Sequence, residues 1–320
     1  MENLKQTIEL EKENIIKLEK EIQKKVIGQN DMIKKILIGI LTGNHILLEG
    51  LPGLAKSLTV NTLAQTLGLK FSRIQFTPDL LPSDILGTEI YNEKTGEFYI
   101  KKGPLFANII LADEINRAPA KVQSALLEAM QEKQITIANE TFKLEQPFIV
   151  LATQNPIEQD GTYPLPEAQQ DRFLMKVKVE YPTLDEEKSV LKLLTSNTDF
   201  EDIKIEEILN KDKIEFFKKL IKEVHIDDKL VDYILNIIFK TREKNEYIEC
   251  GASPRASIAL VISAKANAFL EGRDYVIPQD IKKVIFDILR HRIILTYEAK
   301  AEEKNVEDII TEIMEKVDLP

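Results

Sequence analysis

The segment "HILLEGLPGLAKSLTVNTLAQTLG", residues 45–68, has the order of a buried strand, a glycine-containing turn and a helix. Residues 46–48 are apolar and predict the strand, and the helical spacing after the turn stops at Gly68. The turn, "GLPGLAKS" (50–57), differs by one residue from the phosphate-loop pattern G-x-x-x-x-G-K-[ST], because Ala55 stands where the second glycine is usual. Ala55 adds one methyl group, which the loop can tolerate if the φ of Ala55 is negative. This context predicts a phosphate-binding loop between a strand and a helix.

Short apolar runs alternate with helical patterns through the first half of the chain. The strands predicted in this way are residues 45–50, 73–77, 108–114, 148–153 and 174–179. Several are apolar at consecutive positions, which is typical of a parallel sheet covered by helices on both faces. We therefore predict an α/β fold in which residues 1–182 form a P-loop αβα core with a parallel five-stranded sheet. An amphipathic helix over residues 2–25 would pack on this core.

The strong patterns after Tyr181-Pro182 are helical, and a proline disfavours helix in the residue before it. The helices expected there are residues 185–194, 212–224, 227–242, 254–271, 278–291 and a charged one after 296. Residues 183–320 are therefore predicted to form a separate, all-α domain.

Composition and charge exclude several classes of function. The net charge of −10 opposes general nucleic-acid binding, which needs a basic surface. No apolar run approaches the roughly 18 residues of a membrane span, and the N-terminus has no apolar signal core. Cys250 is the only cysteine, which fits a reducing compartment, and His45, His225 and His291 lie too far apart for metal-ligand spacing. We expect a cytoplasmic protein without membrane insertion.

Two acidic residues at the end of the predicted strand 108–114 complete a possible nucleotide site. Asp113 would hold Mg²⁺ through water, and Glu114 would polarise the water that attacks ATP. In the loop, Lys56 would reach the β- and γ-phosphates and the Ser57 hydroxyl would bind Mg²⁺. The predicted cofactors are therefore ATP and Mg²⁺.

Three further polar residues lie where they could act on the same reaction. Asn155 follows the strand 148–153 and could sit between the γ-phosphate and the attacking water. Arg172 could serve as an arginine finger for a neighbouring subunit's ATP, or form a surface salt bridge with Glu167 or Asp171. Arg255 projects from a predicted helix N-terminus, where the dipole prefers anions, so it would be directed at an anion such as phosphate.

These motifs together resemble the MoxR family of AAA+ ATPases over nearly the whole chain. The matching segments are "VIGQ" (26–29), "GLPGLAKS" (50–57), "ILADEINRAP" (110–119), "ATQNP" (152–156), "PEAQQDRF" (166–173) and "GASPRA" (251–256). They resemble, in order, the adenine-side element, Walker A with its alanine, Walker B, sensor 1, the arginine-finger segment and sensor 2. The nucleotide-binding residues that this implies are Val26, Ile27, Gly28, Gln29, Gly50, Leu51, Pro52, Gly53, Leu54, Ala55, Lys56, Ser57 and Leu58.

The resemblance also implies an architecture and partners. The helical domain would be an AAA+ lid, and residues 86–104 and 135–144 would be hairpin inserts. Relatives form hexameric rings that remodel protein clients in a chaperone-like way, often together with von Willebrand factor A domain proteins. The resemblance places Gln75 at a position that can restrain Glu114, and it allows Arg255 to act across the subunit interface.

Alternative functions stay open at this point. One is the motor subunit of a chelatase-like complex, which shares the architecture. Another is a nucleotide-dependent scaffold with slow turnover, which the presence of Glu114, Asn155 and Arg172 disfavours. A DNA motor is disfavoured by the acidic charge, and no nucleic-acid partner is expected.

Overall fold

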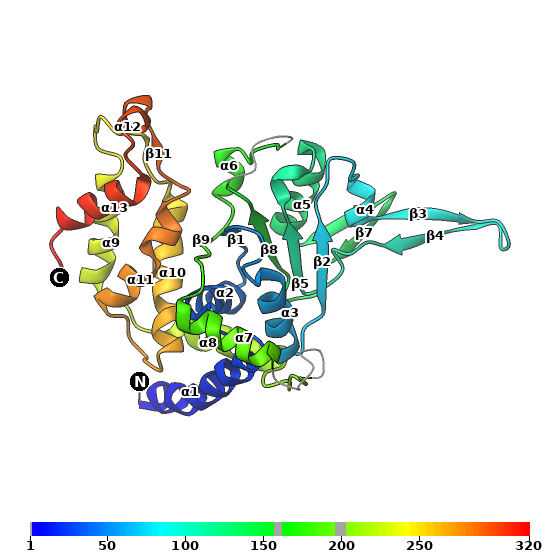
Figure 1. Ribbon diagram of the computed structural model, residues 1–320, viewed down its shortest axis with the longest axis horizontal. Coiled ribbons are helices and arrows are strands. Elements are labelled where there is room, and N and C mark those ends of the chain that lie inside the picture. The colour runs from blue at the N-terminus through cyan, green and yellow to red at the C-terminus, as the bar shows by residue number, and fades with distance from the viewer. Residues whose placement is uncertain (1, 157–161, 196–202) are drawn as a thin grey trace.

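The computed structural model describes residues 2–156, 162–195 and 203–320 (Figure 1). Its centre is a parallel five-stranded sheet in the order β2-β5-β8-β1-β9. The strands are β1 (Ile46–Glu49), β2 (Phe71–Gln75), β5 (Ile109–Asp113), β8 (Ile149–Gln154) and β9 (Met175–Lys178). The parallel sheet and its five predicted strands are therefore confirmed.

Both faces of the sheet are buried, and neighbouring residues of one strand belong to different hydrophobic clusters. In β5, Ile110 packs with Leu47 of β1 and with helix α5 (Ala120–Glu132) in one cluster. The next residue, Leu111, belongs to a second cluster with Ile46, which includes the helices of the opposite face. Because side chains alternate along a strand, a strand buried on both faces is apolar at consecutive positions.

Helices near the N-terminus cover one face of the sheet. They are α1 (Glu2–Gln23), α2 (Asn30–Thr42) and α3 (Lys56–Thr66). In α1, Ile8, Ile15, Leu18 and Ile22 are all buried, so this helix packs on the body as its apolar spacing predicts. Two short elements, α4 (Pro82–Leu86) and α6 (Glu167–Gln170), and the 3-10 turn η1 (Ile115–Arg117) complete the core.

Two antiparallel hairpins occupy the segments predicted as inserts. The first joins β3 (Gly87–Asn92) to β4 (Glu97–Lys102) and extends away from the body (Figure 1). The second joins β6 (Gln134–Ile137) to β7 (Glu140–Lys143). Gly87 has φ 110°, and a Cβ there would lie 2.4 Å from the Lys101 carbonyl oxygen, so the base of the first hairpin requires glycine.

The described residues after Pro182 form helices and the loops between them, together with one short strand pair. The helices are α7 (Leu184–Thr195), α8 (Lys211–Glu223), α9 (Asp228–Lys240), α10 (Pro254–Leu270), α11 (Pro278–Leu289), α12 (Tyr297–Ala301) and α13 (Val306–Glu315). The strand pair is antiparallel, β10 (Ile248–Cys250) with β11 (Ile294–Leu295), and the sequence patterns did not indicate it. The segment after residue 296 forms two helices, because Thr296 and Asn305 each cap a helix of their own.

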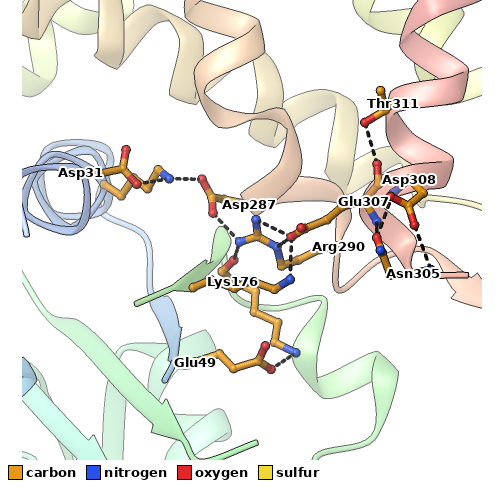
Figure 2. Close-up of polar contacts among 11 residues, drawn as sticks. Asp31, Glu49, Lys176, Asp287, Arg290, Asn305, Glu307, Asp308 and Thr311 are labelled. Carbon is orange, nitrogen blue, oxygen red and sulfur yellow. Dashed lines mark hydrogen bonds and ion pairs between the residues drawn. The ribbon is translucent and has the colours of Figure 1, made fainter. Parts of the chain in front are cut away.

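A series of paired charged side chains connects the helices after residue 182, which we call the lid, to the core (Figure 2). Asp287 on α11 is buried between Lys35 Nζ, at 2.6 Å, and Arg290 Nη1, at 2.5 Å. Arg290 Nη2 also pairs with Glu307 on α13, at 2.9 Å, and Glu307 pairs with Lys178 on β9, at 2.9 Å. Burial raises the pKa of the Asp287 carboxyl, and the two cations oppose that shift. Since charges are tolerated inside a protein when they are paired, these contacts connect α11 and α13 to α2 and β9 at defined positions.

Candidate functional site

A pocket of about 340 Å³ opens at the carboxyl ends of the central strands. The loop between β1 and α3 forms one wall, and the ends of β5 and β8 form the other. Lys56, Ser57, Asp113, Glu114 and Asn155 all line it. The pocket therefore brings together the five side chains that the sequence predicts to act on phosphate, metal and water.

The condition of a negative φ at Ala55 is not met in the structure. Ala55 has φ 55° and ψ 20°, which is the left-handed region, and α3 begins at the next residue. The loop needs this reversal so that the helix starts with its N-terminus towards the pocket. An L-residue in this conformation costs about 1–2 kcal/mol, which explains why the phosphate-loop pattern has glycine at this position.

Lys56 lies across the loop that precedes it. Its Nζ donates a hydrogen bond of 2.7 Å to the Gly50 carbonyl oxygen. Burial lowers the pKa of Lys56, and the negative charges of Asp113 and Glu114 oppose that shift. The ammonium group of Lys56 therefore lies in a pocket that also contains the carboxylates of Asp113 and Glu114. A phosphate that enters this pocket would be attracted to the ammonium group.

Asp113 is fixed by two residues that the sequence analysis did not single out. The Thr153 hydroxyl donates to Asp113 Oδ1 at 2.6 Å, and Arg73 Nη2 pairs with Oδ2 at 2.6 Å. The same Thr153 oxygen accepts the backbone N–H of Glu114 at 2.8 Å. A signal for Thr153 existed, because it lies two residues before Asn155 and side chains two apart on a strand share one face.

Glu114 also has a left-handed backbone, with φ 57°. Its Oε2 pairs with Arg117 Nε at 2.8 Å. Gln75, which the resemblance relates to Glu114, instead accepts a hydrogen bond of 3.1 Å from Arg73 Nη2. Non-glycine residues with this backbone conformation concentrate at functional sites, where the surrounding structure maintains the strain.

The side chains around Asp113 fit a magnesium ion. The carboxylate of Asp113 and the hydroxyl of Ser57 are hard oxygen donors, and the guanidinium of Arg73 shows that Asp113 already holds a cation. Within the described ranges no three His, Cys, Asp or Glu side chains are grouped so that they could hold a metal. Mg²⁺ usually takes one or two carboxylates from the protein and completes its shell with water and phosphate.

A second pocket of about 410 Å³ lies between the core and the lid. Gln29, Tyr181, Asp287 and Arg290 are among its lining residues. Gln29 Nε2 donates to the Glu180 carbonyl at 3.0 Å, so the segment 26–29 is tied to the connection that follows β9. The resemblance places Val26 among the nucleotide-binding residues. In the structure its side chain is 1% exposed and belongs to the hydrophobic core.

The two predicted arginines line a third cavity, of about 380 Å³, apart from the phosphate-loop pocket. Arg172 Nη1 makes a long hydrogen bond of 3.4 Å to the Leu127 carbonyl, and in the part of the chain that is described Arg172 forms no ion pair. Asp171 pairs instead with Arg255, at 3.2 Å, and with Arg292, at 2.8 Å. The anion at Arg255 is therefore a carboxylate of the same chain.

Comparisons with known proteins agree with this fold and site. Residues 45–175 match the model of the ATPase family associated with various cellular activities, and residues 240–313 match the AAA lid domain. The chain is 46% identical to chaperone MoxR1 of Mycobacterium tuberculosis, over 94% of this chain and 81% of that protein. It is also 46% identical to the uncharacterized protein YeaC of Bacillus subtilis, over 93% and 92% of the two chains.

A solved structure is similar throughout. A crystal structure from Cytophaga hutchinsonii, of a protein provisionally assigned as an ATPase, superposes with a TM-score of 0.91 at 51% identity. It covers all of this chain, and 98% of its own chain is matched. The phosphate loop, the acidic strand end and the helical lid thus define a AAA+ ATPase. More narrowly, the chain belongs to the MoxR family.

The left-handed backbone of Ala55 leads to a stability prediction. Ala55→Gly should raise the free energy of unfolding by about 1 kcal/mol, because glycine removes the strain and its greater freedom in the unfolded chain offsets only part of that gain. The control is Ala125→Gly in the regular helix α5, which should lower it by about 1 kcal/mol. Urea denaturation of both variants measures the difference, and a loss of stability in both would contradict the strain.

Proposed function

We propose that this protein hydrolyses Mg²⁺·ATP in a homo-oligomeric ring and uses the reaction to remodel protein clients. The observation that carries the proposal is the convergence of Lys56, Ser57, Asp113, Glu114 and Asn155 in one pocket at the carboxyl ends of β1, β5 and β8. In open parallel sheets this edge is where ligands bind. Cytoplasmic location stays a prediction from the sequence.

The side chains divide the work by their chemistry. Lys56 and the backbone N–H groups at the start of α3 bind the phosphates, and Ser57 with Asp113 holds Mg²⁺. Glu114 accepts a proton from the attacking water, and Asn155 orients that water. Thr153 keeps the two acidic residues in register because it bonds both the Asp113 carboxylate and the Glu114 backbone. When bound, Mg²⁺ would neutralise charge on the phosphates.

The base of the nucleotide would occupy the second pocket, between core and lid. Gly50 at the start of the phosphate loop is so close to Val179, the residue after β9, that a Cβ at Gly50 would lie 2.9 Å from Val179 Cβ. Gln29 is bonded to the next residue, Glu180. The phosphate loop and this second pocket, which we call the base-side pocket, therefore both adjoin the short connection after β9. This arrangement supports one nucleotide that extends from the phosphate loop into the base-side pocket.

The arginines support a shared site between subunits. Arg172 and Arg255 line a cavity to which the chain's own phosphate loop does not contribute, so they are suited to the nucleotide of an adjacent copy. On this proposal assembly completes the active site, because the arginine that stabilises transferred charge comes from a neighbour. The hexameric ring itself is carried over from the family resemblance.

The β3–β4 hairpin is the proposed contact to a client. Tyr91, Phe98 and Tyr99 on this hairpin are 52%, 65% and 50% exposed, which is unusual for three aromatic side chains on one small element. The name of the relative MoxR1 describes a chaperone. A von Willebrand factor A domain protein is the client class that the family resemblance suggests.

Two variants test the hydrolytic site. Lys56→Ala should lose nucleotide binding, because the lysine contacts the phosphates in the ground state. Glu114→Gln should keep binding and lose about 10²–10⁴-fold in turnover, because the glutamate acts on the water. Fluorescent-nucleotide titration and phosphate release measure the two effects, with exposed Lys70→Ala as the control. Equal loss of binding in both variants would remove Glu114 from this role.

The hairpin is tested in the Glu114→Gln chain, which should retain its client when ATP is bound. Adding Phe98→Ser and Tyr99→Ser should abolish that ATP-dependent retention, because the exposed aromatic surface is lost. Thermal unfolding should change little, since both side chains are at least half exposed and Phe98 packs on Tyr91 of the same hairpin. Tyr297→Ser, at an aromatic 83% exposed on α12, is the matched control. Undiminished retention by the hairpin variant would refute the proposed contact.

The shared site is tested by mixing. Arg172→Ala should still bind ATP but lose about 10³–10⁵-fold in turnover, the range of arginine fingers in other P-loop enzymes. Mixing it with Lys56→Ala should restore part of the activity, because some interfaces then combine an intact pocket with an intact arginine. Phosphate release is followed against mixing ratio after subunit exchange. A straight line between inactive endpoints, with exchange confirmed, would disprove action across the interface.

A further inference from the structure

Three consecutive residues of the lid hold the backbone of the segment that carries Arg172. They are Arg290, His291 and Arg292, which directly follow α11. Arg290 Nη1 donates to the Lys176 carbonyl at 2.5 Å, and His291 Nε2 donates to the Phe173 carbonyl at 3.2 Å. Both of these hydrogen bonds join the lid to the segment of residues 171–176 in the core.

Arg292 makes the most extensive contacts of the three. Its side chain is 3% exposed, and it donates to the carbonyl oxygens of Asp171 at 3.3 Å, Phe173 at 2.7 Å and Leu174 at 3.1 Å. It also donates to the carbonyl oxygen of Ile288, on the preceding helix α11, at 2.6 Å and pairs with the Asp171 carboxylate at 2.8 Å. Burial lowers the pKa of Arg292, and the charge of Asp171 opposes that shift.

These contacts lie on both sides of Arg172. Residues 171, 173 and 174 are all bonded by Arg292, whereas the guanidinium of Arg172 itself makes one long hydrogen bond to the described residues. A long side chain with so little restraint of its own is located by its backbone. The position from which Arg172 reaches out is therefore determined by a residue of the lid.

The same short segment also borders the base-side pocket. Arg290 lines that pocket and pairs with Asp287 and Glu307 on two lid helices (Figure 2). Arg292, two residues later, lines the cavity of Arg172 and Arg255. One tight run of chain thus touches the pocket proposed for the chain's own nucleotide and the arginines proposed for the neighbour's.

We infer that Arg292 is a positioning residue for Arg172, and that residues 290–292 couple the lid over one nucleotide to the arginine offered to the next subunit. The inference rests on the proposed shared site. If the lid shifts, residues 171, 173 and 174 must move with it, because otherwise the hydrogen bonds from Arg292 to their carbonyl oxygens would break at once. The lid and the segment that carries Arg172 therefore move together. A displacement of about 1 Å at a reacting group can cost about 10²-fold in rate.

The test is Arg292→Lys, which keeps the charge but cannot reproduce the forked hydrogen bonds. Nucleotide affinity should stay at the wild-type value, because the variant's own pocket is intact, while turnover should fall by about 10–10²-fold. Mixed with Lys56→Ala, the variant should regain activity. Mixed with Arg172→Ala, it should not, because both partners are defective on the arginine side. Arg273→Lys, a lid arginine that donates to the Tyr275 carbonyl at 3.0 Å and pairs with Asp280 at 2.6 Å, is the control and should keep full turnover.

The mixtures separate failure of this inference from failure of the shared site. Rescue of Arg292→Lys by Arg172→Ala, or loss of its nucleotide affinity, would overturn the positioning role. Absence of rescue in the reference mixture of Lys56→Ala with Arg172→Ala would overturn the shared site instead. If thermal unfolding shows that Arg292→Lys does not fold, Asp171→Asn takes its place, because it removes the carboxylate that orients the Arg292 guanidinium towards these carbonyl oxygens. Asp171→Asn should be rescued by Lys56→Ala and not by Arg172→Ala, and any other pattern of rescue would contradict the inference.

Discussion

Burial of the parallel sheet on both faces is the constraint from which the rest of this structure follows. Ile110 and Leu111 are neighbours in sequence and lie in hydrophobic clusters on opposite faces. With both faces closed by helices, polar side chains on these strands can reach solvent only at the strand ends. The phosphate loop, Asp113, Glu114 and Asn155 are all found there, so the packing of the core itself creates the pocket.

Electrostatics then determine how that pocket is held together. Asp113 has one oxygen on Thr153 and the other on Arg73, and Lys56 is bonded to the loop it belongs to. Each charged group of the site therefore has a protein partner, as partly buried charges require. A nucleotide with its metal ion brings both signs of charge and can exchange for these partners without leaving any of them unpaired.

Further charged side chains lie between the core and the lid. Asp171 collects Arg255 and Arg292, while Arg172 beside it stays exposed. Sequence reasoning found Arg172 and Arg255 from their places in motifs, but it did not find Arg292, Arg73 or Thr153. Their partners lie 121, 40 and 40 residues away in the chain, and no local spacing connects residues that meet only after folding.

The sequence by itself determined the order of elements, the parallel sheet, the helical second half and the residues of the phosphate loop, because periodicity and turn chemistry are local properties. The tertiary structure alone decided that Ala55 has a positive φ, that β10 pairs with β11, and that two arginines face a cavity separate from their own phosphate loop. The positive φ of Ala55 is imposed because the loop must join β1 to α3, and β10 forms a strand because its partner β11 lies far along the chain. Neither requirement is present in the residues that fulfil it.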